Sequence, residues 1–277
     1  MKIAVILPAA GLGTRFNATT SVTEVAGISA GSKVEADLAG KPVFIRAIEL
    51  FSNRPEVGQI ILAVNPDRVD EFAFRHGDKL SFLGVTIVAG GKKERWETVQ
   101  KAISAVADDC THVAIHDAAR PLTSDALIRR VFEAAQNYDA VIPGQPVSST
   151  LKRTVAAQPK RDAIDDILGD TGKTITSLKQ VTQTVDRSDL VEVQTPQVFE
   201  INLLRRAYAN LTDGKGITDD AGLVEAMGEP VYVVEGESTN LKITLPEDMK
   251  LAQAIISLST QTTQATARRK LFGDDDE

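Results

Sequence analysis

The sequence predicts an α/β fold in which helices cover both faces of a mainly parallel β-sheet. Runs of β-branched and apolar residues recur along the 277 residues, and most of them alternate with segments that have helical spacing of apolar side chains. A glycine-containing turn follows the first apolar run at once. In sheets of this kind, ligands collect at the carboxyl ends of the strands, so residues that follow strands are the first candidates for a site.

The expected elements follow one another in a regular order. Strands are predicted at residues 3–7, 59–64, 85–89, 112–116, 140–143, 230–234 and 241–244. Helices are predicted at residues 43–53, 95–106, 124–136, 201–210, 221–227 and 247–257. The first run resembles the apolar core of a secretion signal, but it is short and glycines and Arg15 follow it, so a buried strand is the better interpretation.

Three segments interrupt this alternation. Residues 17–32 are rich in Thr, Ser, Gly and Ala, which predicts a long surface loop. Residues 150–190 are polar and irregular, and we expect an extended arm there. Residues 259–277 end in an acidic run, which is typical of a flexible tail. We therefore expect one domain at 1–258, with an arm at about 146–190 inserted in it.

Composition excludes several classes of function. A formal net charge of −7 argues against general nucleic-acid binding, which needs a basic surface to replace counterions. No apolar run reaches the roughly 20 residues that a membrane span needs. The single cysteine, Cys110, excludes an internal disulfide and a multi-cysteine zinc site, and it fits the reducing cytoplasm.

The turn LPAAGLGTRF, at residues 7–16, is the first candidate for chemistry. Its glycines let the chain curl at the end of the strand, where backbone N–H groups can bind phosphate oxygens and Arg15 adds a fixed cation. A purely structural strand-to-helix turn is equally consistent with these ten residues. The spacing matches neither the P-loop nor the dinucleotide fingerprint. Lys33, before Gly40-Lys41-Pro42, offers a second cation that could close over a triphosphate.

Five sequence blocks, taken in order, resemble one family. They are AAGLGTR with the later Lys33 and GKPV, GGKKERWETVQKAI at 90–103, HDAARPL at 116–122, VDRSDLVEVQTPQVF at 185–199, and the stretch from TDDA at 218 through NLKITLPED to Ala252. The chain is similar in this way to the 2-C-methyl-D-erythritol 4-phosphate cytidylyltransferases. That resemblance implies a Rossmann-like sheet of the nucleotide-diphospho-sugar transferase type, and a homodimer made through the 146–190 arm.

The resemblance also implies a role for each matching residue. The residues expected to bind CTP are Ala9, Ala10, Gly11, Gly13, Gly90, Gly91, Thr98 and Asp117. The residues expected to act in catalysis, by stabilising or positioning the phosphates, are Arg15, Lys33, Arg187 and Lys242. The residues expected to contact methylerythritol phosphate are Asp117, Arg120, Thr150, Thr195 and Thr218. Asp117 is in addition a candidate ligand of Mg²⁺, most of whose bonds would go to the CTP phosphates.

Elementary electrostatics agrees with these roles. CTP carries about four negative charges and the alcohol phosphate about two, so the two reactants repel each other unless cations intervene. No nucleophilic side chain is needed, because the substrate's own phosphate oxygen attacks the α-phosphorus and pyrophosphate leaves. Lys242 lies between Leu241 and Ile243 in a predicted strand, so it faces the cleft if those two face the core.

Alternatives remain open at this stage. Asp117 could be only a helix N-cap, and Thr218 could combine capping with substrate contact. The family's sister activity, on ribitol 5-phosphate, needs the same CTP site. A sugar-1-phosphate nucleotidyltransferase would share the glycine turn, although it is not expected to combine HDAARP with QTPQ. A catalytically silent nucleotide-binding protein is the alternative from another functional class.

Overall fold

The computed structural model describes residues 1–11, 32–157, 178–211, 214 and 216–271, with side chains described as far as residue 259. The chain divides into two compact units, residues 1–144 with 193–277 and residues 145–192. The longer strands are β1 (Ile3–Ala9), β4 (Val57–Val64), β5 (Val85–Ala89), β6 (His112–Ile115), β7 (Ala140–Pro146), β8 (Leu151–Ala156), β9 (Lys179–Val185), β10 (Val191–Val193), β11 (Gln197–Glu200) and β12 (Tyr232–Glu235). The helices are α2 (Val43–Glu49), α3 (Val69–Phe82), α4 (Arg95–Ile103), α5 (Asp125–Ala134), α7 (Ile201–Ala209), α8 (Ala221–Glu225) and α9 (Pro246–Leu271). The short elements are the 3₁₀ turns η1 (Lys33–Glu35) and η2 (Pro66–Arg68) and the two-residue strands β2 (Asp37–Leu38) and β3 (Lys41–Pro42).

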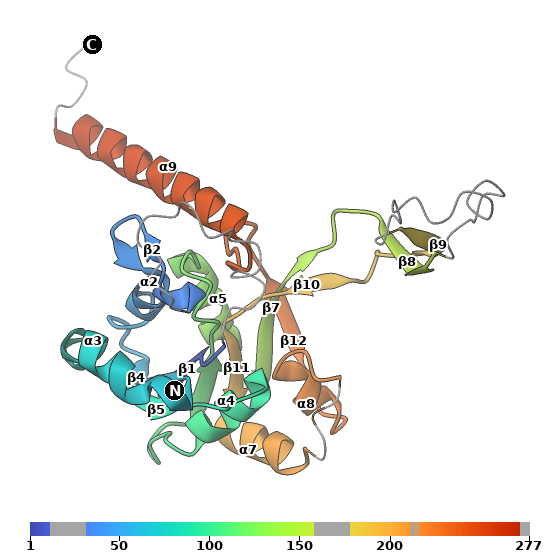
Figure 1. The fold of residues 1–277 in the computed structure, drawn as a ribbon, viewed down its shortest axis with the longest axis horizontal. Coiled ribbons are helices and arrows are strands. Elements are labelled where there is room, and N and C mark those ends of the chain that lie inside the picture. Colours follow the sequence, from blue (N-terminus) through green and yellow to red (C-terminus); the bar gives the residue numbers. More distant parts are fainter. Residues whose placement is uncertain (12–31, 158–177, 212–213, 215, 272–277) are drawn as a thin grey trace, which may run out of the picture. The chain divides into compact units, whose positions relative to one another are not determined.

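The sheet of the first unit is mainly parallel, as the sequence predicts. Its strands follow the order β7-β11-β6-β1-β4-β5, and β12 pairs with β7 (Figure 1). Strand β1 is parallel to both β4 and β6, and β4 is parallel to β5, whereas β11 is antiparallel to β6 and β7. The carboxyl ends of β5, β4, β1 and β6 therefore lie at one edge of the sheet, where a ligand site is expected.

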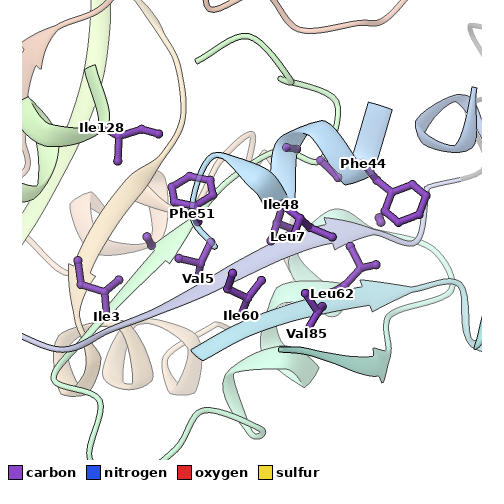
Figure 2. Packing of buried hydrophobic residues seen from close by; sticks show 14 of the residues in the cluster. Ile3, Val5, Leu7, Phe44, Ile48, Phe51, Ile60, Leu62, Val85 and Ile128 are labelled. Carbon is purple, nitrogen blue, oxygen red and sulfur yellow. The ribbon is translucent and has the colours of Figure 1, made fainter. Parts of the chain in front are cut away.

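Side chains alternate between the two faces of the sheet and build two cores. Along β1, Val5 and Leu7 join one cluster and Ala4 and Ile6 join the other. The first cluster includes apolar residues of α2 and α5, and Figure 2 shows Phe44, Ile48 and Phe51 packed over the strands. The second cluster includes apolar residues of α4, α7 and α8. Burial of β1 on both faces explains why its sequence is almost entirely apolar.

Several expectations about individual elements were wrong. Residues 241–244 form no strand but an irregular segment, which a backbone bond from Ile243 N to Ala119 O (2.8 Å) ties to the turn after β6. Helix α3 was missed, because it buries only Phe72 and Leu80 and its apolar stripe is weak. The antiparallel strand β11 was missed as well. The helix expected to end at Ser257 continues to Leu271, while the flexibility of residues 259–277 stays a prediction.

The second unit contains a two-stranded antiparallel pair, β8 and β9. Almost every side chain of these strands is exposed. The extended character expected for this segment agrees with that pairing, and the segment's role in dimerisation stays a prediction. Residues 158–177 of the unit, and most of the loop expected at 17–32, lie outside the described residues. Within the part of the chain that the structure describes, no helix combines the length and apolarity needed to span a bilayer.

Candidate functional site

A cavity of about 370 Å³ opens at the carboxyl edge of the sheet. Its described lining comes from the end of β1, from η1, from the loop between β5 and α4, from the turn after β6, and from the 241–244 segment. The residues are Pro8, Ala9, Ala10, Gly11, Lys33, Val34, Gly91, Lys92, Lys93, Glu94, Arg95, Thr98, Asp117, Ala118, Ala119, Lys242 and Thr244. Among them, five cationic side chains stand against two carboxylates. The cavity is therefore locally positive although the whole chain is acidic, which suits an anionic ligand.

One wall of the cavity depends on two glycines that follow β5. A Cβ added to Gly90 would lie 2.8 Å from Thr98 Cγ2 and 2.9 Å from Ala10 Cβ, so this backbone packs directly against α4 and the residue that follows β1. The Gly91 N–H donates to Thr98 Oγ1 at 3.0 Å, and Thr98 is buried in the first turns of α4. This contact fixes the β5–α4 loop against the start of the helix, where backbone N–H groups favour negative charge.

Asp117, two residues after the end of β6, lies at the centre of a cluster of cations. Lys242 Nζ is 2.8 Å from Asp117 Oδ2, and Arg95 Nε is 3.2 Å from Asp117 Oδ1. Arg120 Nε lies farther away, 3.6 Å from Asp117 Oδ2. Arg120 is three residues from Asp117 in the sequence, whereas Arg95 and Lys242 come from distant segments that meet at this carboxylate.

The charge state of Asp117 follows from this setting. Burial alone would raise the pKa of the carboxyl, but the positive charges of Arg95 and Lys242 outweigh burial and hold the pKa well below its usual range. Asp117 is therefore ionised at every pH at which the protein is expected to work. Burial also lowers the pKa of Arg120, and the negative charge of Asp117 opposes that effect.

His116 and Thr195 hold the turn that presents Asp117. The Arg120 carbonyl lies 3.0 Å from His116 Nε2 and can only accept, so Nε2 carries the proton and Nδ1 accepts from the Thr195 hydroxyl at 3.1 Å. Thr195 Oγ1 also accepts from the Asp117 N–H at 3.1 Å. Burial lowers the pKa of His116 from 6.5 to about 4, so the ring is neutral at pH 7. These contacts give His116 a structural role.

The two lysines predicted to bind phosphates meet at this cavity. Leu241 and Ile243 pack into an apolar cluster with the start of α9, so Lys242 between them turns toward Asp117. The alternation inferred from the sequence is thus confirmed, although the segment is not a strand. Lys33 Nζ donates to the Ile243 carbonyl at 3.0 Å, which brings η1 to the same segment.

Not every predicted site residue lies at this cavity. Gly13 and Arg15 lie outside the described residues. Gly90, Arg120 and Thr195 are placed one layer behind the lining, as described above. Thr218 is exposed and is not part of the described lining. Thr150 and Arg187 are exposed residues of the second unit.

Arg95, Lys92 and Lys93 were not predicted as cavity residues, although all three lie in the block GGKKERWETVQKAI at 90–103. Arg95 contacts Asp117 and also Asp220, whose Oδ2 lies 2.6 Å from Arg95 Nη1. The signal that could have found it is an arginine at the first position of a helix that begins at the carboxyl edge of the sheet.

Comparison with known proteins identifies relatives of this chain. The family model described as IspD, 2-C-methyl-D-erythritol 4-phosphate cytidylyltransferase, matches residues 3–258. Proteins of that name from Solibacter usitatus and Rhodopirellula baltica are 38% and 37% identical over 259 and 267 residues. The matches cover 92% of this chain in both cases, and 96% and 95% of those relatives.

Solved structures agree with the sequence relatives. The crystal structure of 2-C-methyl-D-erythritol 4-phosphate cytidylyltransferase from Thermus thermophilus matches with a TM-score of 0.66 at 29% identity, covering 93% of this chain and 100% of that one. The 4-diphosphocytidyl-2C-methyl-D-erythritol synthase from Anaerococcus prevotii matches with a TM-score of 0.68 at 26% identity, covering 92% and 98%. Together with the model match over nearly the whole length, these similarities show that the chain belongs to the 2-C-methyl-D-erythritol 4-phosphate cytidylyltransferase family.

Proposed function

We infer that this chain transfers the cytidylyl group of CTP to 2-C-methyl-D-erythritol 4-phosphate and releases pyrophosphate, a step of the non-mevalonate isoprenoid pathway. Family membership supports the reaction. The observation that carries the proposal to this chain is the cation cluster around Asp117, at the carboxyl edge of a parallel sheet and open to a cavity.

The nucleotide would bind along the β1 and β5–α4 wall. Ala9, Ala10 and Gly11 would offer their backbone to the phosphates, and Gly91 and Thr98 would lie beside the cytidine. Among the described residues, no heavy atom lies within 4 Å of where a Cβ of Gly11 would be, so these residues leave room for a ligand there. In our proposal Gly13 and Arg15 extend the phosphate-binding turn and Gly90 supports the wall.

The alcohol phosphate would bind beside Asp117. Its phosphate oxygen attacks the α-phosphorus of CTP, the new P–O bond forms as the bond to the β-phosphate oxygen breaks, and pyrophosphate carries away the electron pair. Lys33 and Lys242 would stabilise the charge that gathers on the transferring phosphate, so catalysis consists of positioning and electrostatics. Asp117, Arg120, Thr195 and Thr218 would help to hold the alcohol, with Arg120 and Thr195 acting from behind the lining.

A divalent cation such as Mg²⁺ would neutralise part of the triphosphate charge when bound. Among the described residues no group of three or more His, Cys, Asp or Glu side chains lies together as a metal site. Both oxygens of Asp117 already face cations. This donor set fits a metal that is held mainly by the nucleotide phosphates and water, which is common for Mg²⁺. We therefore propose that Mg²⁺ enters with CTP, and direct ligation by Asp117 stays a prediction.

We also propose a homodimer formed through the 146–190 arm. Leu178, Val155 and Val181 are 63%, 50% and 54% exposed, and a two-stranded hairpin is marginally stable without further packing. A second copy of the chain would cover these side chains. Arg187 and Thr150 of the arm would then position methylerythritol phosphate. The single Cys110 supports a cytoplasmic location, which is also a proposal.

The test is pyrophosphate release by the purified chain with CTP and Mg²⁺, measured with 2-C-methyl-D-erythritol 4-phosphate and with ribitol 5-phosphate in parallel. We expect turnover with the first alcohol and a kcat/KM at least about 100-fold lower with the second. Turnover with ribitol 5-phosphate alone would replace our substrate. CTP binding without turnover on either alcohol would establish a silent nucleotide-binding protein.

A further inference from the structure

A second buried carboxylate, Asp220, lies behind the cation cluster. Asp220 directly precedes α8 and is 1% exposed. Its Oδ2 is 2.6 Å from Arg95 Nη1, and its Oδ1 accepts a hydrogen bond from the Tyr208 hydroxyl at 2.6 Å. Neither Asp220 nor Tyr208 lines the described cavity, whereas Arg95 does. A chain of polar contacts thus runs from the buried interior to the cavity.

Arg95 is the link between the two carboxylates. It is the first residue of α4, and its side chain reaches Asp117 through Nε and Asp220 through Nη1. The planar guanidinium has a fixed fork of donors, so two acceptors at different edges define both its position and its orientation. The negative charges of Asp220 and Asp117 outweigh burial and raise the pKa of Arg95, so it stays charged.

Tyr208 fixes the far end of this chain. It projects from α7, is 4% exposed, and gives its only hydroxyl proton to Asp220. Burial, followed by the negative charge of Asp220, raises the pKa of Tyr208, so the hydroxyl remains a donor at neutral pH. Gln197 and Asp219 hold the neighbouring turn, with Gln197 Nε2 2.7 Å from Asp219 Oδ2 and the Ala221 N–H 3.2 Å from Gln197 Oε1.

We propose that Asp220 and Tyr208 are positioning residues, which hold the Arg95 guanidinium in the place where it orients Asp117 and faces the phosphates of the nucleotide. This inference rests on the proposed function of the cavity. Without Asp220, Asp117 is the one carboxylate partner that Arg95 keeps among the described residues. Arg95 can then swing toward Asp117 in a bidentate pair, which competes with Lys242 for the same oxygens. The role of Asp220 and Tyr208 is exerted entirely through Arg95.

A double-mutant cycle tests this dependence. Tyr208→Phe removes one oxygen and keeps the ring, so it is the mildest change available, and Asp220→Asn removes the charge. We expect kcat/KM for CTP to fall about fivefold in Tyr208→Phe and about 50-fold in Asp220→Asn. In an Arg95→Ala background, Tyr208→Phe should change kcat/KM less than about twofold, because the group that it positions is gone. Equal fold-changes in both backgrounds would overturn the proposal.

Chemical rescue adds a readout that a merely structural role does not move. Ethylguanidinium at millimolar concentration should restore part of the activity of Arg95→Ala, because Asp117 and Asp220 can bind its guanidinium group. In Arg95→Ala/Asp220→Asn the restored activity should be about tenfold lower. Rescue that is equal in the two proteins would contradict the role of Asp220. Far-ultraviolet circular dichroism and urea unfolding show which variants are folded, and Tyr138→Phe, at a surface tyrosine stacked on Tyr232, is the matched control.

The same proteins separate this inference from the proposed function. Turnover by the unmodified chain tests the function first. If it is absent, the cycle is read from the affinity for Mg²⁺-CTP by calorimetry, where the same coupling between Tyr208 and Arg95 is expected. Independent effects on affinity would then overturn the positioning role.

Discussion

The cavity and the arm hold their polar residues by opposite means. At the cavity, Asp117 is 7% exposed and three cations face it. In the arm, Thr150 and Arg187 are exposed, and strands β8 and β9 bury almost none of their side chains. The first arrangement is fixed by the fold of one unit, so the chain alone places its charges. The described part of the second buries almost no side chains, so it gains little stability from packing of its own.

The largest effect is expected from removing the cavity cations. Lys242→Ala and Lys33→Ala should each lower kcat/KM about 100- to 1,000-fold, equivalent to about 3–4 kcal/mol, because each contributes charge to the transferring phosphate. Pyrophosphate release measures the effect. Lys79→Ala, at an exposed lysine of α3, is the matched control and should retain full activity. A less than twofold loss in Lys242→Ala would refute the proposed role of the cluster.

The next prediction distinguishes two roles for Asp117, alignment of the neighbouring cations and ligation of the metal. Asp117→Asn should lower kcat/KM about 30-fold, because Lys242 and Arg95 lose the charge that aligns them. If Asp117 aligns cations, raising Mg²⁺ should not restore the activity. If Asp117 ligates the metal, the apparent KM for Mg²⁺ should rise and high Mg²⁺ should recover most of the rate. Titration of the rate with Mg²⁺ separates the two roles.

The third prediction concerns the arm and tests whether its exposed Arg187 acts on the substrate. Arg187→Ala should raise the KM for methylerythritol phosphate about tenfold and leave the KM for CTP nearly unchanged. If Arg187 completes the site of a second subunit, refolding a mixture of Arg187→Ala and Lys242→Ala chains should give hybrid dimers with one intact site each. Because random pairing makes half of the dimers hybrid, the mixture should have about one quarter of the parental activity. If Arg187 serves its own subunit, the mixture should be no more active than the sum of its components.

A smaller effect is expected on stability below neutral pH. The folded-state pKa of His116, about 4, lies below the ordinary 6.5, so the unfolded chain binds the proton first and stability falls as the pH drops from about 6.5 toward 4. Because of His116, the free energy of unfolding should fall by roughly 2.5 kcal/mol between pH 7 and pH 4.5. Asp117, whose pKa is depressed, keeps its contribution across this window. Urea unfolding of the parent and of His116→Gln should show a shallower pH dependence in the variant; parallel curves would contradict the burial argument.

The smallest effect concerns the nucleotide wall. Gly90→Ala should lower the unfolding free energy by about 1–2 kcal/mol and raise the KM for CTP, because the new methyl group lies within 3 Å of Thr98 and Ala10. Gly77→Ala lies in the middle of α3, where no heavy atom of the described residues, apart from the chain neighbours and the nearby helix backbone, comes within 4 Å of the new Cβ. It is the matched control and should stabilise the protein by about 0.5–1 kcal/mol. Equal effects of the two substitutions, measured by urea unfolding, would show that the wall is not closely packed.

Local sequence patterns were sufficient for much of the fold and for part of the site. The parallel strands have long β-branched runs, which predict them directly. Lys33, Asp117 and Lys242 were expected at one site because their sequence blocks resemble those of a known family, and strand alternation added only the direction of Lys242. Arg95 and Asp220 could not be paired in this way, because 125 residues separate them and only the packing of α4 against the turn before α8 brings them together. Strand β11 is four residues long, which is too short for a periodic signal.

A crystal structure of the chain with CTP and Mg²⁺ would show whether the cavity cations bind the triphosphate. We expect the triphosphate in the cavity at the carboxyl edge of β1, with Lys33 Nζ and Lys242 Nζ within hydrogen-bond distance of phosphate oxygens. A triphosphate held elsewhere, with Lys242 still paired only to Asp117, would contradict this expectation.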